Sequence, residues 1–416
     1  MPRTLTGLAL AVALVATACT GAGDNAEDGG DTGATTEQTA SVAAEEETPL
    51  FDGDVTLGPM EDAALRAEIE ALTIGDAGGL DAVMADIGVP GLAVAVIRDG
   101  GLVLLDGWGT DPADGAPIDG ETVFQVGSVS KPVAALTLHA AGAAGEVDLD
   151  VPLADSTADP AVLDLLGTDA AAITPRLLLA HRGGVGPDGF LGYGATEQQP
   201  DTLGVLTGDG NSTAISVTAP PDTAFSYSGG GYMLAQHLAE TQTGSSLDEL
   251  AERYLFEPLA MSSTSYSVDP PIEVFARSTA GSSVGNALPE GYRRHPEAAA
   301  AGLWSSATDL ALLLLGMQLA LLDPEAELAA PAAASIAPTS TTEDLIVGSG
   351  WFLDRDQDPG WFWHNGRNIG FAAEVVASTD GRHGAVILTN SLQGPELIDQ
   401  ILRTIATYEG WPDPPR

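Results

Sequence analysis

The segment Phe124-Gln125-Val126-Gly127-Ser128-Val129-Ser130-Lys131-Pro132 joins a short apolar stretch to a helical one, residues 133–143. Proline is tolerated in the first turn of a helix, so Pro132 predicts a helix that begins close to Ser128. The spacing between Ser128 and Lys131 places both side chains on one helix face, about one turn apart. The segment therefore predicts a hydroxyl and an amine in close contact.

Lys131 is the only lysine in the 416-residue chain, and the rest of the 15 basic residues are arginines. An arginine is always protonated, whereas the pKa of a lysine can fall until the amine accepts a proton. The helix N-terminus would lower that pKa and favour negative charge on the Ser128 oxygen. A serine beside a neutral amine is a minimal arrangement for nucleophilic catalysis, so the pair predicts a serine hydrolase. The alternative is a solvent-facing lysine beside a serine that caps the helix.

This segment resembles the nucleophile region of the penicillin-recognising serine hydrolases of the class C beta-lactamase type. That superfamily includes DD-peptidases, D-aminopeptidases and esterases. Four further segments resemble its motifs in the same order: LLLAHRGG at 177–184, FSYSGGGY at 225–232, AGLWSSATDL at 301–310 and WHNGRNIGF at 363–371. An ordered set of matches is far more specific than any single motif.

The resemblance implies an acyl-transfer site without a cofactor. Ser128 would be the nucleophile, and Lys131 and the Tyr227 phenolate would share the role of general base, each lowering the pKa of the other. His364 would hydrogen-bond Tyr227 or the leaving group. The oxyanion hole would consist of the backbone N–H groups of Ser128 and Arg367.

Glycines of the same motifs, Gly229 and Gly366, would let the backbone approach the substrate closely. Gly229 replaces the usual asparagine of the tyrosine motif, and His364 replaces the usual lysine of the third motif. Both departures make beta-lactam hydrolysis a weaker prediction than DD-peptidase, D-aminopeptidase or small-ester hydrolysis. Arg367 is a candidate contact for a substrate carboxylate. His181 is expected to support the fold.

Strand patterns lie at both ends of the chain. Residues 91–97 and 102–105 flank the turn Asp99-Gly100, and residues 371–377 and 385–388 flank Asp380-Gly381. A helix is expected at 395–408, and the middle of the chain is mostly helical. The pattern predicts an α+β domain over 59–412, with an antiparallel sheet from both chain ends, flanking helices and an inserted helical subdomain. The resemblance implies the beta-lactamase/transpeptidase-like fold.

The first 18 residues have the pattern of a secretory signal: Arg3, an apolar run and then small residues. Cys19, the only cysteine, follows at once and is the predicted lipidation site. Residues 19–58 are Gly-, Thr- and acid-rich, which predicts a flexible tether. We therefore expect an exported protein that contacts the membrane through a lipid anchor. The alternative is an ordinary cleaved signal and a secreted protein.

The net charge of −44 argues against nucleic-acid binding, because there is no basic patch to meet phosphates. It also predicts a surface adapted to high salt. A single cysteine excludes an intramolecular disulfide, and no histidine or carboxylate spacing indicates a metal site. The expected partner is a small-molecule or peptide substrate. Two rival functions are a catalytically silent binding or sensor lipoprotein and a peptidoglycan-interaction module.

Overall fold

The computed structural model of the chain describes residues 62–411, except 157, 195, 342–344 and 355–359. The signal (1–18), the lipidation site Cys19 and the whole tether (19–58) therefore lie outside the described residues. Within the described ranges, no helix is both long and apolar enough to cross a membrane.

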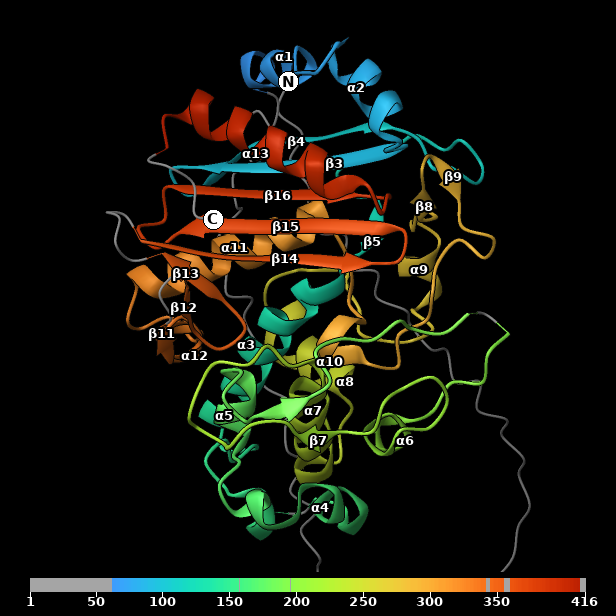
Figure 1. Cartoon of the computed structure of the whole chain (residues 1–416). Helices are drawn as coiled ribbons and strands as arrows, with labels where there is room; N and C mark the ends of the chain where they lie inside the picture. Colours follow the sequence, from blue (N-terminus) through green and yellow to red (C-terminus); the bar gives the residue numbers. More distant parts are fainter. Residues whose placement is uncertain (1–61, 157, 195, 342–344, 355–359, 412–416) are drawn as a thin grey trace, which may run out of the picture. The chain divides into compact units, whose positions relative to one another are not determined.

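A large antiparallel sheet has the strand order β11-β12-β13-β14-β15-β16-β3-β4 (Figure 1). Its strands are β3 (Gly91–Arg98), β4 (Gly101–Gly109), β11 (Ser340–Thr341), β12 (Ile346–Val347), β13 (Phe352–Asp354), β14 (Trp361–Asn368), β15 (Phe371–Ser378) and β16 (His383–Thr389). β3 pairs with β16, with Ala95 opposite Val386. The prediction of one sheet built from both ends of the chain is confirmed.

Alternating side chains of β3 divide the core between the two faces of the sheet. Leu92, Val94 and Val96 pack with α1 (Ala63–Glu70), α2 (Leu80–Ile87) and α13 (Gly394–Glu409). Ala93, Ala95 and Ile97 face the opposite core, which includes α3 (Ser130–Ala143) and α11 (Ala307–Leu322). Figure 1 shows α13 lying along one face of the sheet and α11 behind it. Both faces are thus covered by helices.

The regular elements of the inserted region between α3 and α11 are mostly helices joined by long loops, and α4 to α8 and α10 gather below the sheet in the view of Figure 1. Its helices are α4 (Pro160–Leu166), α5 (Pro175–Leu179), α6 (Thr202–Thr207), α7 (Gly229–Thr243), α8 (Leu247–Ala251), α9 (Ile272–Phe275) and α10 (Ala298–Ala301); α12 (Ala329–Ser335) follows α11. Short strand pairs join its loops: β6 (Val185–Gly186) with β7 (Ser216–Val217), and β8 (Ser282–Ser283) with β9 (Asn286–Ala287). The predicted helical insertion is confirmed.

Two short elements connect the insertion to the nucleophile segment. β5 (Val123–Gln125) pairs with β10 (Trp304–Ser306), and the chain then passes through a 3₁₀ turn, Gly127–Val129, into α3. A further strand pair, β1 (Thr73–Ile74) with β2 (Ala77–Gly78), lies near the start of the described chain. Ser128 therefore lies in the turn that precedes the helix.

Candidate active site

Ser128 is partly buried in the 3₁₀ turn and is held there by its neighbour Ser130. The Ser130 hydroxyl donates to Gly127 O at 2.6 Å and accepts the Leu303 N–H at 2.9 Å. Gly127 has a φ of +53°, a conformation that glycine adopts without strain. These contacts fix the turn, and with it the direction of the Ser128 side chain.

Lys131 lies in the first turn of α3, and its side chain is buried. Its Nζ lies 3.0 Å from Ser128 Oγ and donates to Ala300 O at 2.7 Å. Burial lowers the pKa of Lys131 to about 7. The structure thus brings the predicted hydroxyl and amine into contact, with desolvation as the cause of the lowered pKa in place of the helix N-terminus.

The end of α10 links Lys131 to strand β14. Ala300 O accepts from Lys131, and the next carbonyl, Ala301 O, accepts from Asn368 Nδ2 at 3.0 Å. Asn368 also donates to Gln125 Oε1 at 3.1 Å, and Gln125 donates to Arg293 O at 2.6 Å. The base, the nucleophile segment and β14 therefore share one polar network.

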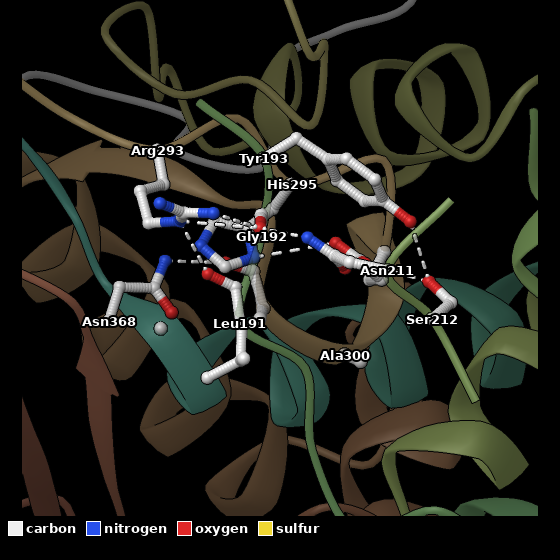
Figure 2. A network of polar contacts seen from close by, with 12 residues as sticks. Leu191, Gly192, Tyr193, Asn211, Ser212, Arg293, His295, Ala300 and Asn368 are labelled. Carbon is white, nitrogen blue, oxygen red and sulfur yellow. Dashed lines mark hydrogen bonds and ion pairs between the residues drawn. The ribbon is translucent and has the colours of Figure 1, made fainter. Parts of the chain in front are cut away.

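Figure 2 shows the outer part of this network, where side chains converge on the loop around Gly192. Arg293 Nη2 and Asn211 Nδ2 both donate to Gly192 O, at 2.8 and 2.9 Å. On the same loop, the Tyr193 hydroxyl lies 2.8 Å from Ser212 Oγ. These bonds hold the loop against the segment that leads into α10.

Tyr227 lies immediately before the N-cap of α7, and Lys131 Nζ is 4.8 Å from the centroid of its ring. Burial raises the pKa of Tyr227 to about 12, against a lowering by a hydrogen bond with Ser128. The expectation that Tyr227 and Lys131 lower each other's pKa is therefore wrong for Tyr227. Burial disfavours the charged phenolate, so the phenol keeps its proton near neutral pH.

His364 is buried on β14, and its ring stacks on Phe352 with centroids 4.9 Å apart. Its Nδ1 lies 2.5 Å from Asn365 O, whereas its Nε2 has no hydrogen-bond partner among the described residues. Burial lowers the pKa of His364 to about 3, so the ring is neutral. The centroids of the His364 and Tyr227 rings are 6.2 Å apart, so these two residues interact through their aromatic rings.

Gly366 and Arg367 continue β14 past the nucleophile segment. A Cβ at Gly366 would collide with Val126 O and lie 2.9 Å from the Ser128 nitrogen, so only glycine permits this close approach. The backbone nitrogen of Arg367 similarly adjoins Gly127. The structure places both backbone N–H groups of the predicted oxyanion hole in this one region.

The Arg367 side chain, however, does not join Ser128. Strand alternation puts it with Asn365 on the face opposite His364, where it lines a cavity of about 430 Å³ next to α13. This placement does not support the expected contact between the Arg367 guanidinium and a substrate carboxylate at Ser128, because the guanidinium lies on the other face of β14.

Gly229 is buried at the start of α7 and does not face open space. Its N–H donates to Asp188 O at 2.9 Å, and a Cβ would lie 3.0 Å from the Phe190 ring. The expectation that Gly229 admits substrate is corrected: the 188–190 loop occupies the space that an asparagine side chain would need.

Two site residues escaped the sequence reasoning. Phe352 stacks on both His364 and Tyr227, and Ala300 supplies the carbonyl that holds Lys131. Neither belongs to a motif that encodes these contacts, although Ala300 immediately precedes the recognised 301–310 segment. Within the described ranges, no group of three or more His, Cys, Asp or Glu side chains is arranged to hold a metal ion.

The fold and the Ser128–Lys131 pair together define a protein of the beta-lactamase and penicillin-binding class. The chain belongs to the Beta-lactamase family, whose model matches residues 79–407. It is 32% identical over 181 residues to penicillin-binding protein 4 of Amycolatopsis lactamdurans, covering 44% of this chain and 46% of that one. It is 31% identical over 182 residues to the unguisins hydrolase ungD of Aspergillus violaceofuscus, covering 42% and 31%. The chain thus spans less than half the length of either curated relative.

Among solved structures, the octameric penicillin-binding protein homologue from Pyrococcus abyssi has a similar fold. The TM-score is 0.64 at 21% identity, with 84% of this chain and 78% of that chain covered. At this identity the likeness concerns the fold alone.

Proposed function

We propose that this protein is a serine hydrolase that cleaves an amide or ester through an acyl-enzyme on Ser128. The observation that carries the proposal is the 3.0 Å contact between Ser128 Oγ and a buried amine whose pKa is about 7. Near neutral pH, about half of such an amine is free to accept a proton.

In the first step, neutral Lys131 keeps one N–H on Ala300 O and turns its lone pair to Ser128. Lys131 takes the hydroxyl proton as Ser128 Oγ attacks the substrate carbonyl carbon, and the C=O electron pair moves to oxygen. The N–H groups of Ser128 and Arg367 would stabilise this oxyanion; one such donor contributes roughly 3 kcal/mol. The tetrahedral intermediate then expels its leaving group, which takes up a proton, and water later releases the acyl group.

Tyr227 is the proposed proton donor to the leaving group. Its raised pKa keeps the phenol protonated, and its ring lies beside Lys131, the partner of Ser128. The proton that Lys131 took from Ser128 would then pass to the Tyr227 phenolate, which restores a neutral amine and a neutral phenol before water attacks the acyl group. His364, which is neutral and has an unpartnered Nε2, is the proposed second contact for the leaving group.

The proposed substrate class is a DD-peptidase-like or D-aminopeptidase-like amide, or a small ester. Two observations make beta-lactam hydrolysis less favoured: His364 carries no positive charge for a substrate carboxylate, and Gly229 offers no side-chain amide. The names of the relatives, a penicillin-binding protein and a hydrolase, are compatible with this class. A catalytically silent binding protein of the same fold is the alternative.

Intact-mass labelling with a fluorophosphonate and with a fluorescent penicillin tests the proposal. We expect a fluorophosphonate adduct on the wild type and no adduct on Ser128→Ala. The control Ser262→Ala, which changes an exposed serine, should be labelled like the wild type. Absence of any Ser128-dependent adduct would end the enzyme proposal in favour of the silent binder. An adduct with the fluorophosphonate alone favours an esterase, and adducts with both probes favour a penicillin-binding peptidase.

We also propose that the protein is exported and lipid-anchored through Cys19. The signal pattern of residues 1–18 and the single cysteine directly after it support this proposal. Expression with a labelled fatty acid should give a labelled wild type that sediments with membranes. Cys19→Ala should lose both the label and the sedimentation; a wild-type chain without label would point to a secreted protein.

A further inference from the structure

His181 holds the chain on both sides of Tyr227. Its backbone O accepts the Ser226 N–H at 2.8 Å, and its Nδ1 accepts the Ser228 N–H at 3.0 Å. The two donors are the residues immediately before and after Tyr227. The stretch that leads to Tyr227 has no regular structure, so these bonds to one residue replace a helix or strand as its support.

The ring of His181 also lies flat against the ring of Tyr227. Their centroids are 4.5 Å apart and their planes differ by 26°. Phe225 meets the His181 ring edge-on at 5.7 Å, which fixes the imidazole from another side. Offset stacking of this kind favours one ring orientation, and Tyr227 has His181 beneath it and Lys131 close to its ring.

The bond to Ser228 requires a neutral His181, because a protonated imidazole has no acceptor nitrogen. His181 is 1% exposed, and burial lowers its pKa well below the usual value, with further lowering by Lys131 and His364. Its φ of +55° is uncommon for a residue with a side chain. A conformation of this kind persists only where the surrounding contacts impose it.

We infer that His181 is a positioning residue of the reaction: it fixes the Tyr227 ring beside Lys131 through one ring stack and two hydrogen bonds from the backbone N–H groups of Ser226 and Ser228. The inference rests on the proposed function. His181 touches no reacting atom, so it acts only through Tyr227. It should therefore matter most for the step in which Tyr227 protonates the leaving group.

That step can be isolated by the choice of leaving group. An alkyl alcohol leaves well only when it is protonated, whereas p-nitrophenolate leaves without a proton. Loss of Tyr227 positioning should therefore slow the hydrolysis of an alkyl ester much more than that of a p-nitrophenyl ester of the same acid. A general loss of structure would slow both esters equally.

Two variants separate the contributions of His181. His181→Phe keeps an aromatic ring against Tyr227 but removes the acceptor for Ser228. His181→Asn keeps a side-chain acceptor and tolerates a positive φ, but removes the ring. The matched control is His139→Asn, because His139 is also a buried histidine but lies on α3, with no ring contact to Tyr227 among the described residues. Each variant retains one of the two supports, the ring stack or the acceptor for Ser228. The test therefore remains possible if only one of the two variants folds.

We expect each His181 variant to lower kcat for the alkyl ester about 10- to 100-fold, and for the p-nitrophenyl ester less than about 3-fold. In a Tyr227→Phe background the same substitutions should have no further effect on the alkyl ester, since residues that act as a unit are not additive. Equal losses on both esters, full additivity with Tyr227→Phe, or unchanged kinetics would overturn the inference. A wild type with neither a Ser128-dependent adduct nor Ser128-dependent turnover of either ester would instead reject the proposed function.

Discussion

At the scale of single residues, burial determines the chemistry of the site. Lys131 and His364 are both desolvated, which lowers both pKa values, and the Tyr227 pKa rises for the same reason. Desolvation disfavours whichever form is charged, so all three side chains tend to be neutral together. A neutral amine accepts a proton and a neutral phenol donates one, which divides the two roles between different residues.

The first prediction concerns the pH dependence of acylation. Since Lys131 accepts a proton only when it is neutral, the acylation rate should rise about tenfold per pH unit below pH 7 and level off above it. The measurement is kcat/KM for an uncharged ester from pH 5 to pH 10. Lys131→Arg should be inactive over this range, because arginine keeps its proton. A midpoint near the ordinary lysine pKa would contradict the assignment of Lys131 as base.

The second prediction concerns stability. The pKa of Lys131 falls from 10.5 in the unfolded chain to about 7 in the folded one, so the unfolded chain binds the proton more tightly. Folding is therefore penalised most below pH 7, and the penalty disappears as pH rises from 7 to 10.5. In urea unfolding at pH 6, the free energy of unfolding of Lys131→Met should exceed that of the wild type by roughly a few kcal/mol. This difference should shrink at pH 9. A pH-independent difference would show that Lys131 is not buried as described.

At the scale of elements, the sequence predicts what depends on local pattern. The strands around Asp99-Gly100 and Asp380-Gly381 and the last helix follow from periodicity and turn residues. The short strands β11 to β13 carry two or three residues each, too few for a periodicity to be visible. The spacing of Ser128 and Lys131 likewise predicts their contact, whereas Tyr227 and His364 come from the resemblance alone.

What the sequence cannot predict are the contacts set by distant elements. The direction of the Arg367 side chain depends on which face of β14 meets α13, and the position of Gly229 depends on the 188–190 loop. The stack of His181 on Tyr227 joins residues 46 positions apart. Such contacts arise from tertiary packing, which no local pattern encodes.

The third prediction tests the approach of β14 to the nucleophile turn. In Gly366→Ala the new methyl group would collide with the Val126 carbonyl, a backbone atom that cannot move alone, so β14 and the turn must separate. Because this displaces one proposed oxyanion donor, acylation should slow at least about 100-fold, with a lower melting temperature. Gly189→Ala is the control: its Cβ would meet nothing within 4 Å. A Gly366→Ala variant with half the wild-type rate would show that the approach is not needed.

At the scale of the whole molecule, the charges are strongly unbalanced. Every arginine in the described ranges except Arg367 forms an ion pair with a carboxylate. With 59 acidic and 15 basic residues in the chain, most carboxylates must lack a cationic partner. Exposed pairs contribute little each, about 0–1 kcal/mol, so repulsion among the surplus carboxylates is the larger effect.

The fourth prediction follows from this repulsion. Salt screens charges beyond about 10 Å at 0.1 M and beyond about 3 Å at 1 M, so added salt should relieve the repulsion in the folded state more than it weakens the close ion pairs. The melting temperature should therefore rise steadily between 0.05 and 2 M NaCl at pH 7. The effect should diminish as the pH approaches 4.1, the isoelectric value, because protonation then removes the surplus charge. A melting temperature that stays level or falls with salt at pH 7 would mean that the folded chain tolerates its charge of −44 without screening.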